Sequence, residues 1–417
     1  MLDTGLALAE SNPFYLLATT HGEHAAGFDG SFEKKNRRIW NGFMAHTLQQ
    51  EFRENLAKTL EVDPEEMRPL SDREIQHIEE RFKLANIPFE KLPDPDAMHG
   101  FSTISFRELV FEKSVLLSNR VFPFVIDFSR SKFSMNFSMQ KSILAAAHFS
   151  DTHFQRFAYF REAKMGNIGW IGNAVEFRNA RFWRQATFSK AQLKNADFTK
   201  AKFEEAARFD DTIFYGGCPK FYEATLPEDT VFPLKPENWG FPTPSIDRFG
   251  THEPYTPLQL KIESNSFTAL RRRMEELQRP EDAHFFTRLE FRAKGQPKGW
   301  YSLLVKLYGW FSNYGYSIGR PLASLLFLVG LGCAAYLGYF VSSSAVLDNS
   351  PETPFWTGLG YSFSNTFSFF GLGKLVEQKL VEQLPSVLKF FAGIQTVLGL
   401  IFSFLLALGL RNHFRVG

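Results

Sequence analysis

Cysteine is nearly absent from this chain of 417 residues. The two that occur, Cys218 and Cys333, are too few for a disulfide framework, so a reducing compartment is expected. An excess of charge of one sign is also lacking, because the formal net charge is only +2. A charge this close to zero identifies no partner.

Catalytic and metal-binding motifs are missing too. The chain has no phosphate-binding loop, no HExxH motif and no nucleophile elbow, so we expect a protein that is not an enzyme and uses no cofactor. His21 and His24 flank Gly22 and Glu23. Two histidines in a polar loop without further ligands do not predict a metal site.

The beginning of the chain lacks the features of an export signal. It contains no basic segment and no sustained apolar run, and Asp3, Glu10 and Pro13 interrupt it. We therefore expect that the large amino-terminal part is not exported and stays in the compartment where the chain is synthesised.

Two long runs near the carboxyl end, residues 321–341 and 390–410, are both uncharged and predominantly apolar. Each is about twenty residues long, enough to cross the ~30 Å hydrocarbon core of a bilayer. We interpret them as membrane-spanning helices rather than soluble core helices, since such runs rarely occur in soluble folds. The sequence thus predicts a multi-pass protein of the cell (inner) membrane, in contact with the lipid bilayer, with both termini in the cytoplasm.

The middle of the chain repeats with a period of five residues. Between residues 175 and 214 a Phe or Leu recurs every five residues, with an occasional sixth inserted, and a small residue usually precedes it by two. These central residues are Phe177, Phe182, Phe188, Leu193, Phe198, Phe203, Phe209 and Phe214. A period of five fits neither a helix nor a flat strand, so the chain must turn a corner at each repeat and form a solenoid.

A looser form of the same ladder extends toward the amino terminus. Its predicted inward residues are Phe106, Phe111, Leu116, Phe128, Phe133, Phe149, Phe154, Phe160, Met165 and Trp170.

The pattern resembles the pentapeptide-repeat family, in which each repeat has a small residue, a polar one, a central Phe or Leu and two polar ones. The segment ATFSKAQLKNADFTKAKF matches it closely. The resemblance implies a right-handed, four-sided β-helix with coils about 4.8 Å apart. Some family members imitate DNA with an acidic surface, but residues 106–214 carry seventeen Lys or Arg against eleven Asp or Glu. We therefore expect no DNA mimicry and no nucleic-acid partner; the basic surface is either solvated or close to anionic lipid.

Helical segments flank the repeat. Residues 36–60 place apolar side chains four apart, as one helical stripe requires, and a second helix begins at Ser71 with a capping box to Glu74. We expect these helices to cap the solenoid or to contact a neighbouring chain. After the repeat, residues 219–257 are expected to form an irregular cover, and residues 258–292 a helical hairpin broken at Pro280. The predicted domains are 1–100 (helical region and linker), 101–235 (solenoid with cover), 236–316 (hairpin linker) and 317–417 (membrane domain).

The segment between the two apolar runs is not a simple loop. Thr353 and Pro354 suit a helix start, and the apolar stretch that follows is interrupted by polar residues. They are Thr357, Ser362, Ser364, Asn365, Thr366 and Ser368. A segment this polar does not suit lipid, so residues 353–374 predict a re-entrant helix covered by protein.

This segment ends in FSFFGLGK, which resembles the pore loop of two-helix cation channels. On that resemblance Gly371, Leu372 and Gly373, preceded by Phe369 and Phe370, stand at the Gly-Tyr-Gly filter, where glycines let carbonyls face the ion. Potassium selectivity cannot be carried over, because the filter threonine, tyrosine and following acidic residue are replaced by Phe, Leu and Lys. The resemblance implies a homo-oligomer, a tetramer by preference, that passes monovalent cations.

Polar and small residues also form stripes within the two apolar runs. Gln395, Gly399 and Ser403 lie four apart, which predicts either pore-lining residues or helix packing. Gly330, Ala334 and Gly338 form a stripe with packing as the favoured role. The sequence thus predicts an oligomeric channel with a cytoplasmic solenoid as sensor or assembly platform. The alternative is a membrane-anchored scaffold without conductance.

Overall fold

The computed structural model describes residues 5–24, 30–46, 48–98, 102–166, 174–240, 245–246, 252–253, 257–295, 299–342, 354–370 and 384–414. The chain divides into two units, Met1–Leu289 and Glu290–Gly417.

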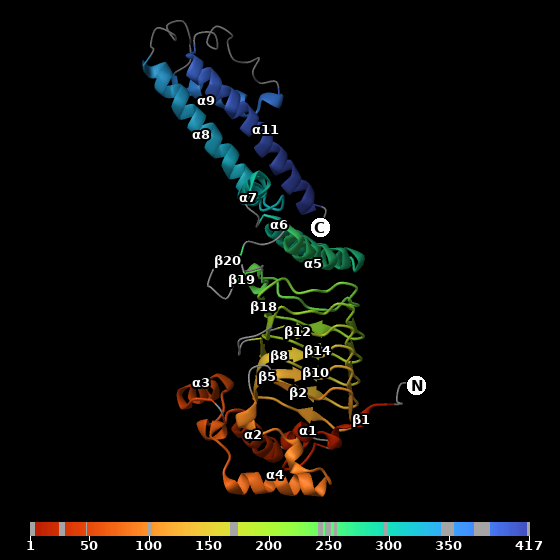
Figure 1. Cartoon of the computed structure of the whole chain (residues 1–417). Helices are drawn as coiled ribbons and strands as arrows, with labels where there is room; N and C mark the ends of the chain where they lie inside the picture. Colours follow the sequence, from red (N-terminus) through yellow and green to blue (C-terminus); the bar gives the residue numbers. More distant parts are fainter. Residues whose placement is uncertain are drawn as a thin grey trace. The chain divides into compact units, whose positions relative to one another are not determined.

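Short parallel strands form a β-solenoid in the first unit (Figure 1). One sheet contains, in order, β1 (Ala7–Leu8), β3 (Leu109–Phe111), β6 (Lys132–Phe133), β9 (His153–Phe154), β13 (Arg181–Phe182) and β16 (Lys202–Phe203). A second contains β17 (Ala207–Arg208), β14 (Ala186–Thr187), β10 (Ala158–Tyr159), β7 (Phe137–Ser138) and β4 (Val115–Leu116). A third contains β18 (Ile213–Tyr215), β15 (Gln192–Lys194), β11 (Lys164–Met165), β8 (Ile143–His148), β5 (Val121–Asp127) and β2 (Thr103–Ser105), and β12 (Val175–Glu176) pairs with β8. Two further short strands, β19 (Ser245–Ile246) and β20 (His252–Glu253), pair antiparallel.

Stacked phenylalanine rings fill the solenoid. One column contains Phe106, Phe128, Phe149, Phe177, Phe198 and Phe221, with successive ring centroids 4.7–5.2 Å apart. A second contains Phe111, Phe133, Phe154, Phe182 and Phe203, with spacings of 4.6–5.1 Å. The spacing equals the distance between neighbouring strands, so each coil adds one ring to each column. The five-residue ladder is confirmed; its right-handed winding stays a prediction.

The predicted ladder is wrong at one position. Leu116 is half-buried, and the inward position belongs to Leu117, which is 2% exposed. The reason is an inserted sixth residue between Phe111 and the next inward side chain, which moves the register by one. Trp170, another predicted member, lies outside the described residues.

Helices cover the amino-terminal end of the solenoid. They are α1 (Pro13–Ala18), α2 (Gly30–Met44), α3 (Gln50–Leu60) and α4 (Asp72–Leu84), with 3-10 turns at η1 (Ala9–Ser11), η2 (Pro64–Met67), η3 (Phe89–Lys91) and η4 (Pro95–Ala97). The capping box is confirmed, since the Ser71 backbone nitrogen donates to Glu74 Oε2 at 2.8 Å. The single stripe over residues 36–60 is wrong, because the chain leaves the helix after Met44 and begins a new one at Gln50.

Polar contacts attach α2 to the first coil. Trp40 Nε1 donates to the Val121 carbonyl at 3.0 Å, and Asn41 Oδ1 accepts from the Val121 nitrogen at 3.0 Å. Arg120, fully buried, pairs with Glu33 at 2.7 Å between Nη1 and Oε1. An open β-solenoid end has unpaired backbone groups that invite another chain, so α2 serves as its cap, one of the two roles the sequence predicts.

The other end differs from the irregular cover expected there. Residues 219–239 complete another coil, in which Phe221 stacks on Phe198 and Phe232 on Phe209. The closing residue is Trp239, whose ring contacts Phe267 at 5.9 Å and Phe286 at 5.1 Å. These two rings belong to α5 (Pro257–Glu276) and α6 (Pro280–Lys294), the predicted hairpin.

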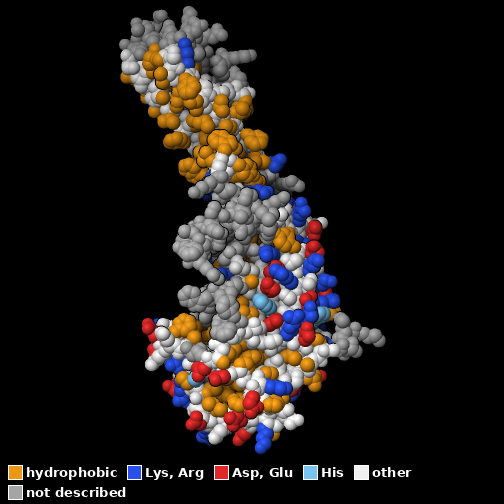
Figure 2. All heavy atoms as spheres, viewed as in Figure 1, with side chains coloured by type: hydrophobic (Ala, Val, Ile, Leu, Met, Phe, Trp, Pro, Cys, Tyr) orange, Lys and Arg blue, Asp and Glu red, His pale blue; other side chains and the backbone are white. Residues whose placement is uncertain are grey.

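The second unit is helical. It contains α7 (Trp300–Ser312), α8 (Gly319–Ser342), α9 (Pro354–Thr366), a 3-10 turn η7 (Ser368–Phe370) and α11 (Ser386–Phe414). The helices α8 and α11, of 24 and 29 residues, are long and apolar enough to cross a bilayer, and they lie side by side with α9 packed against both (Figure 1). Figure 2 shows hydrophobic side chains over much of the visible face of this unit.

Candidate functional site

The short helix α9 has a reversed burial pattern. Its buried side includes Thr357, Ser362, Ser364 and Thr366, whereas Phe355, Trp356 and Phe363 are 48%, 60% and 46% exposed. Helices of soluble proteins turn the apolar side inward. The polar side of α9 instead faces α8 and α11.

Gln395 of α11 is the centre of the polar contacts. Its side chain is 0% exposed, and Nε2 lies 2.7 Å from Ser362 Oγ and 3.0 Å from Thr366 Oγ1. Its Oε1 accepts a hydrogen bond from the Tyr336 hydroxyl of α8 at 2.9 Å. One amide therefore connects all three helices. Because the amide is buried, water cannot replace its hydrogen bonds, and losing them would destabilise the unit.

Glycines allow this close approach. A Cβ atom on Gly399 would overlap the Thr366 carbonyl, and one on Gly332 would overlap Ser362 Oγ and Gln395 Nε2. On the α9 side, a Cβ on Gly358 would lie 3.2 Å from the Leu337 backbone nitrogen. Small residues let helices approach closely enough for interhelical hydrogen bonds.

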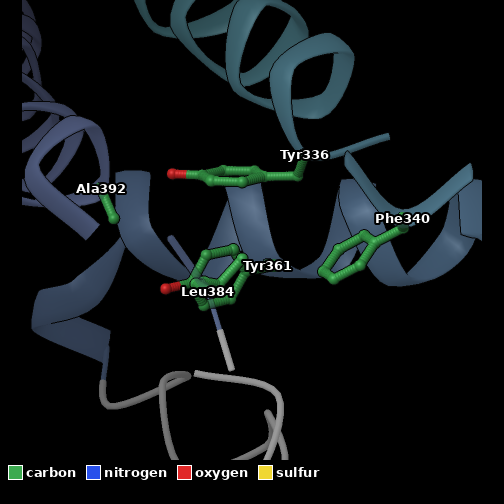
Figure 3. Packing of buried hydrophobic residues seen from close by; sticks show 5 residues of the cluster. All are labelled: Tyr336, Phe340, Tyr361, Leu384 and Ala392. Atoms are coloured by element: carbon green, nitrogen blue, oxygen red, sulfur yellow. The ribbon is translucent and has the colours of Figure 1, made fainter. Parts of the chain in front are cut away.

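An aromatic and aliphatic cluster continues the contact beyond Gln395. Its members are Tyr336, Phe340, Tyr361, Leu384 and Ala392, shown in Figure 3. The rings of Tyr336 and Tyr361 meet edge to face, with centroids 4.7 Å apart at 77°. An edge-to-face pair is the favoured aromatic geometry, and it fixes α9 against α8.

Two of the three residues of the predicted stripe on α11, Gln395 and Gly399, contact α9. Gln395 and Gly399 are buried there, as the packing alternative requires, while their role as pore-lining residues stays a prediction. Ser403 is half-buried, and its Oγ has no hydrogen-bond partner among the described residues.

The predicted stripe on α8 does not pack within the described chain. A methyl group added at Gly330 or Gly338 would have no described atom within 4 Å, and Ala334 is exposed. The side of α8 that contacts its neighbours carries Gly332 and Tyr336 instead. Neither residue was predicted from the sequence, although Gly332, Tyr336 and Phe340 lie four apart.

The predicted filter lies at the edge of the described chain. Phe369 is 48% exposed, and Phe370 ends η7. Gly371, Leu372 and Gly373 lie outside the described residues.

The two amino-terminal histidines have separate neighbours. His24 Nε2 lies 3.6 Å from Glu33 Oε2, and the His21 ring lies 5.8 Å from that of His77. Burial, with a smaller effect of His77, lowers the pKa of His21. Within the described ranges no group of three or more His, Cys, Asp or Glu side chains could hold a metal ion.

The comparison with protein families concerns the solenoid. A family model described as pentapeptide repeats matches residues 176–214 with eight copies. The solenoid is similar to pentapeptide repeats. A comparison with curated proteins found no match.

Proposed function

We propose that this protein forms a homo-oligomeric membrane pore for monovalent cations, with the pentapeptide-repeat solenoid as a cytoplasmic sensor or assembly domain. In this proposal α8 and α11 cross the membrane of the cell, and α9 enters it without crossing. The observation that carries the proposal is the reversed burial of α9, with its polar side fixed by Gln395.

Reversed burial is stable where the surroundings are apolar. In water, the exposed rings of Phe355, Trp356 and Phe363 would forfeit roughly 25 cal/mol for each Å² left unburied. In lipid or against another copy that cost disappears, and close packing together with the hydrogen bonds of Gln395 holds the three helices together.

The length of α9 supports a re-entrant segment. Its 13 residues extend about 20 Å, less than the ~30 Å hydrocarbon core. A helix that ends inside the hydrocarbon core needs protein or water around its last carbonyl groups. Gly371, Leu372 and Gly373 follow it closely in the sequence, and in this proposal their backbone carbonyls coordinate the ion.

Several copies are needed for a closed path. The described part of one chain supplies two helices long enough to cross a bilayer and the short α9, too few to surround a channel. A ring of identical chains can enclose the path with one repeated interface. The resemblance to pore-loop channels favours a ring of four chains.

Single-channel recording of the purified full-length protein in planar bilayers tests the proposal. Gly371→Val and Gly373→Val should abolish the current, because a branched side chain restricts the carbonyl geometry. Gly330→Val is the matched control, since its methyl groups would enter open space on α8. If the wild type passes no current and has a monomeric mass in detergent, the channel proposal fails and the anchored scaffold takes its place. If the two glycine variants conduct like the wild type, the assignment of residues 371–373 as the filter fails.

A further inference from the structure

The helix α7 also has an apolar exposed surface. Its exposed side chains are Trp300, Tyr301, Leu303, Leu304, Leu307 and Trp310, the two tryptophans at 73% and 71%. Ser302 and Ser312, by contrast, are buried and donate hydrogen bonds to the carbonyls of Gly295 and Tyr308. Lys306 is the single charged residue of α7.

A tight turn fastens α7 to the beginning of α8. Asn313, Tyr314 and Gly315 all have left-handed backbone, with φ of 49°, 58° and 84°. The Tyr314 ring packs on Gly309 of α7, and Arg320 Nη1 of α8 donates to the Gly309 carbonyl at 3.0 Å. Three successive left-handed residues, one of them a tyrosine, persist only where the surroundings hold them.

The same turn contacts the carboxyl end of α11. Asn412 Nδ2 donates to the Gly315 carbonyl at 3.0 Å, and a Cβ on Gly315 would lie 2.9 Å from Leu408. Nearer the middle of α11, Phe402 meets Phe311 of α7 with centroids 5.0 Å apart. A movement of α7 would therefore also move the end of α11.

We propose that α7 lies along the membrane surface, with its exposed side chains at the boundary between lipid head groups and acyl chains, and that it thereby positions the carboxyl end of α11. The occupant of this apolar surface is lipid. The proposal rests on the membrane placement of α8 and α11 in the proposed function.

The length and composition of α7 support lipid as the occupant. Its 13 residues extend about 20 Å, too short to cross a bilayer. Trp and Tyr favour the interface, and Lys306 can extend its ammonium group to water. Leu322, Leu326 and Phe327 of α8 are exposed as well, so lipid would cover apolar side chains of both helices.

Spin labelling of the full chain in phosphatidylcholine liposomes tests the position of α7. The two native cysteines are replaced (Cys218→Ala, Cys333→Ala), and one label is introduced at a time through Leu304→Cys or Leu307→Cys. Phe327→Cys on α8 is the control for depth and Phe157→Cys on the solenoid the control for water, since both positions are exposed. Oxygen and a water-soluble nickel chelate report the depth of each label.

The labels on α7 should lie at an intermediate depth, shallower than that at residue 327. If they are as accessible to nickel as the label at residue 157 while residue 327 remains deep, the inference fails and the membrane placement survives. If residue 327 is also in water, the placement of α8 fails. Labels on α7 shielded from both reagents would identify a second copy as the occupant and overturn the lipid assignment.

A second measurement tests the connection to α11. Asn412→Ala should increase the mobility of a label at residue 304 at least about twofold without changing its depth, because the bond to Gly315 is lost. His413→Ala is the matched control, since that side chain is exposed beside Asn412. Equal mobility in both variants would overturn the positioning role of α7.

Discussion

The two units of this protein differ in where they place polar and aromatic side chains. The solenoid stacks phenylalanine rings inside, and on its surface Arg181 and Arg184 pair with glutamates of the next coil. The helical unit buries Gln395, Ser362 and Thr366 beside its aromatic and aliphatic cluster, and it exposes other aromatic rings. The difference teaches that the surroundings, and not the composition alone, decide which side of an element turns inward. Four variants test that contrast.

The largest effect is expected in the solenoid core. Phe188→Ala should destabilise the protein by about 4 kcal/mol, because the ring is fully buried between Phe160 and Phe209 and leaves a cavity. Urea unfolding followed by tryptophan fluorescence measures it. Trp183→Ala, on the exposed surface, should cost less than about 1 kcal/mol; equal losses would mean that the ring columns do not hold the solenoid together.

A somewhat smaller effect is expected at the amino-terminal cap. Arg120→Met should cost about 3 kcal/mol, because it leaves the Glu33 carboxylate buried without its partner. The double variant Arg120→Met, Glu33→Gln should recover part of that loss in the same urea experiment. A double variant no more stable than the single one would contradict an energetic role for the charge on Glu33.

In the helical unit, Gln395→Leu should cost about 1–2 kcal/mol, although leucine is the more apolar residue. It removes the acceptor of the Tyr336 hydroxyl and the amide near Ser362. Unfolding in mixed micelles by SDS, followed by circular dichroism, measures the change. Thr396→Val is the control, because that hydroxyl donates within its own helix, to the Ala392 carbonyl; a stabilising Gln395→Leu would remove the contrast between the units.

The smallest effect concerns pH. Burial, then the neighbouring Arg181 and Lys132, lower the pKa of His153. Between about pH 7 and pH 5 the unfolded chain therefore binds more protons at this histidine, so stability is present at the higher pH and declines as pH falls. His153→Gln should reduce that decline, measured as the difference in urea midpoint between the two pH values. An unchanged difference would contradict the lowered pKa.

Much of the solenoid could be predicted because the period of a repeat determines which residues face inward. Every fifth residue turns inward and meets a counterpart one coil away, so Phe177 and Phe198 follow from spacing alone. An insertion is harder to predict. Phe111 and Leu117 are six residues apart instead of five, and because residues 116 and 117 are both leucine, only the structure shows which of them faces inward. The break between Met44 and Gln50 was hidden for a similar reason, since both helices continue the same apolar spacing.

The candidate site could be predicted only in part. The spacing of Gln395 and Gly399 indicates a polar stripe, but their partners depend on how three helices meet. Ser362 is 33 residues from Gln395 and Tyr336 is 59 residues away. Local patterns contain no information on such pairs. On α8 two stripes have the same spacing of four, and only the contacts with Ser362 and Gln395 show that Gly332, not Gly330, faces the other helices.

The connection made by Gln395 has a consequence for synthesis. This residue is the last of the three partners to leave the ribosome, 33 residues after Ser362, a delay of roughly 2–7 s at about 5–20 residues per second. During that interval the polar side of α9 has no amide to bind. Each new chain therefore passes through an interval in which the hydroxyl groups of Ser362 and Thr366 lack the Gln395 amide, and a chain that stops before residue 395 never gains it.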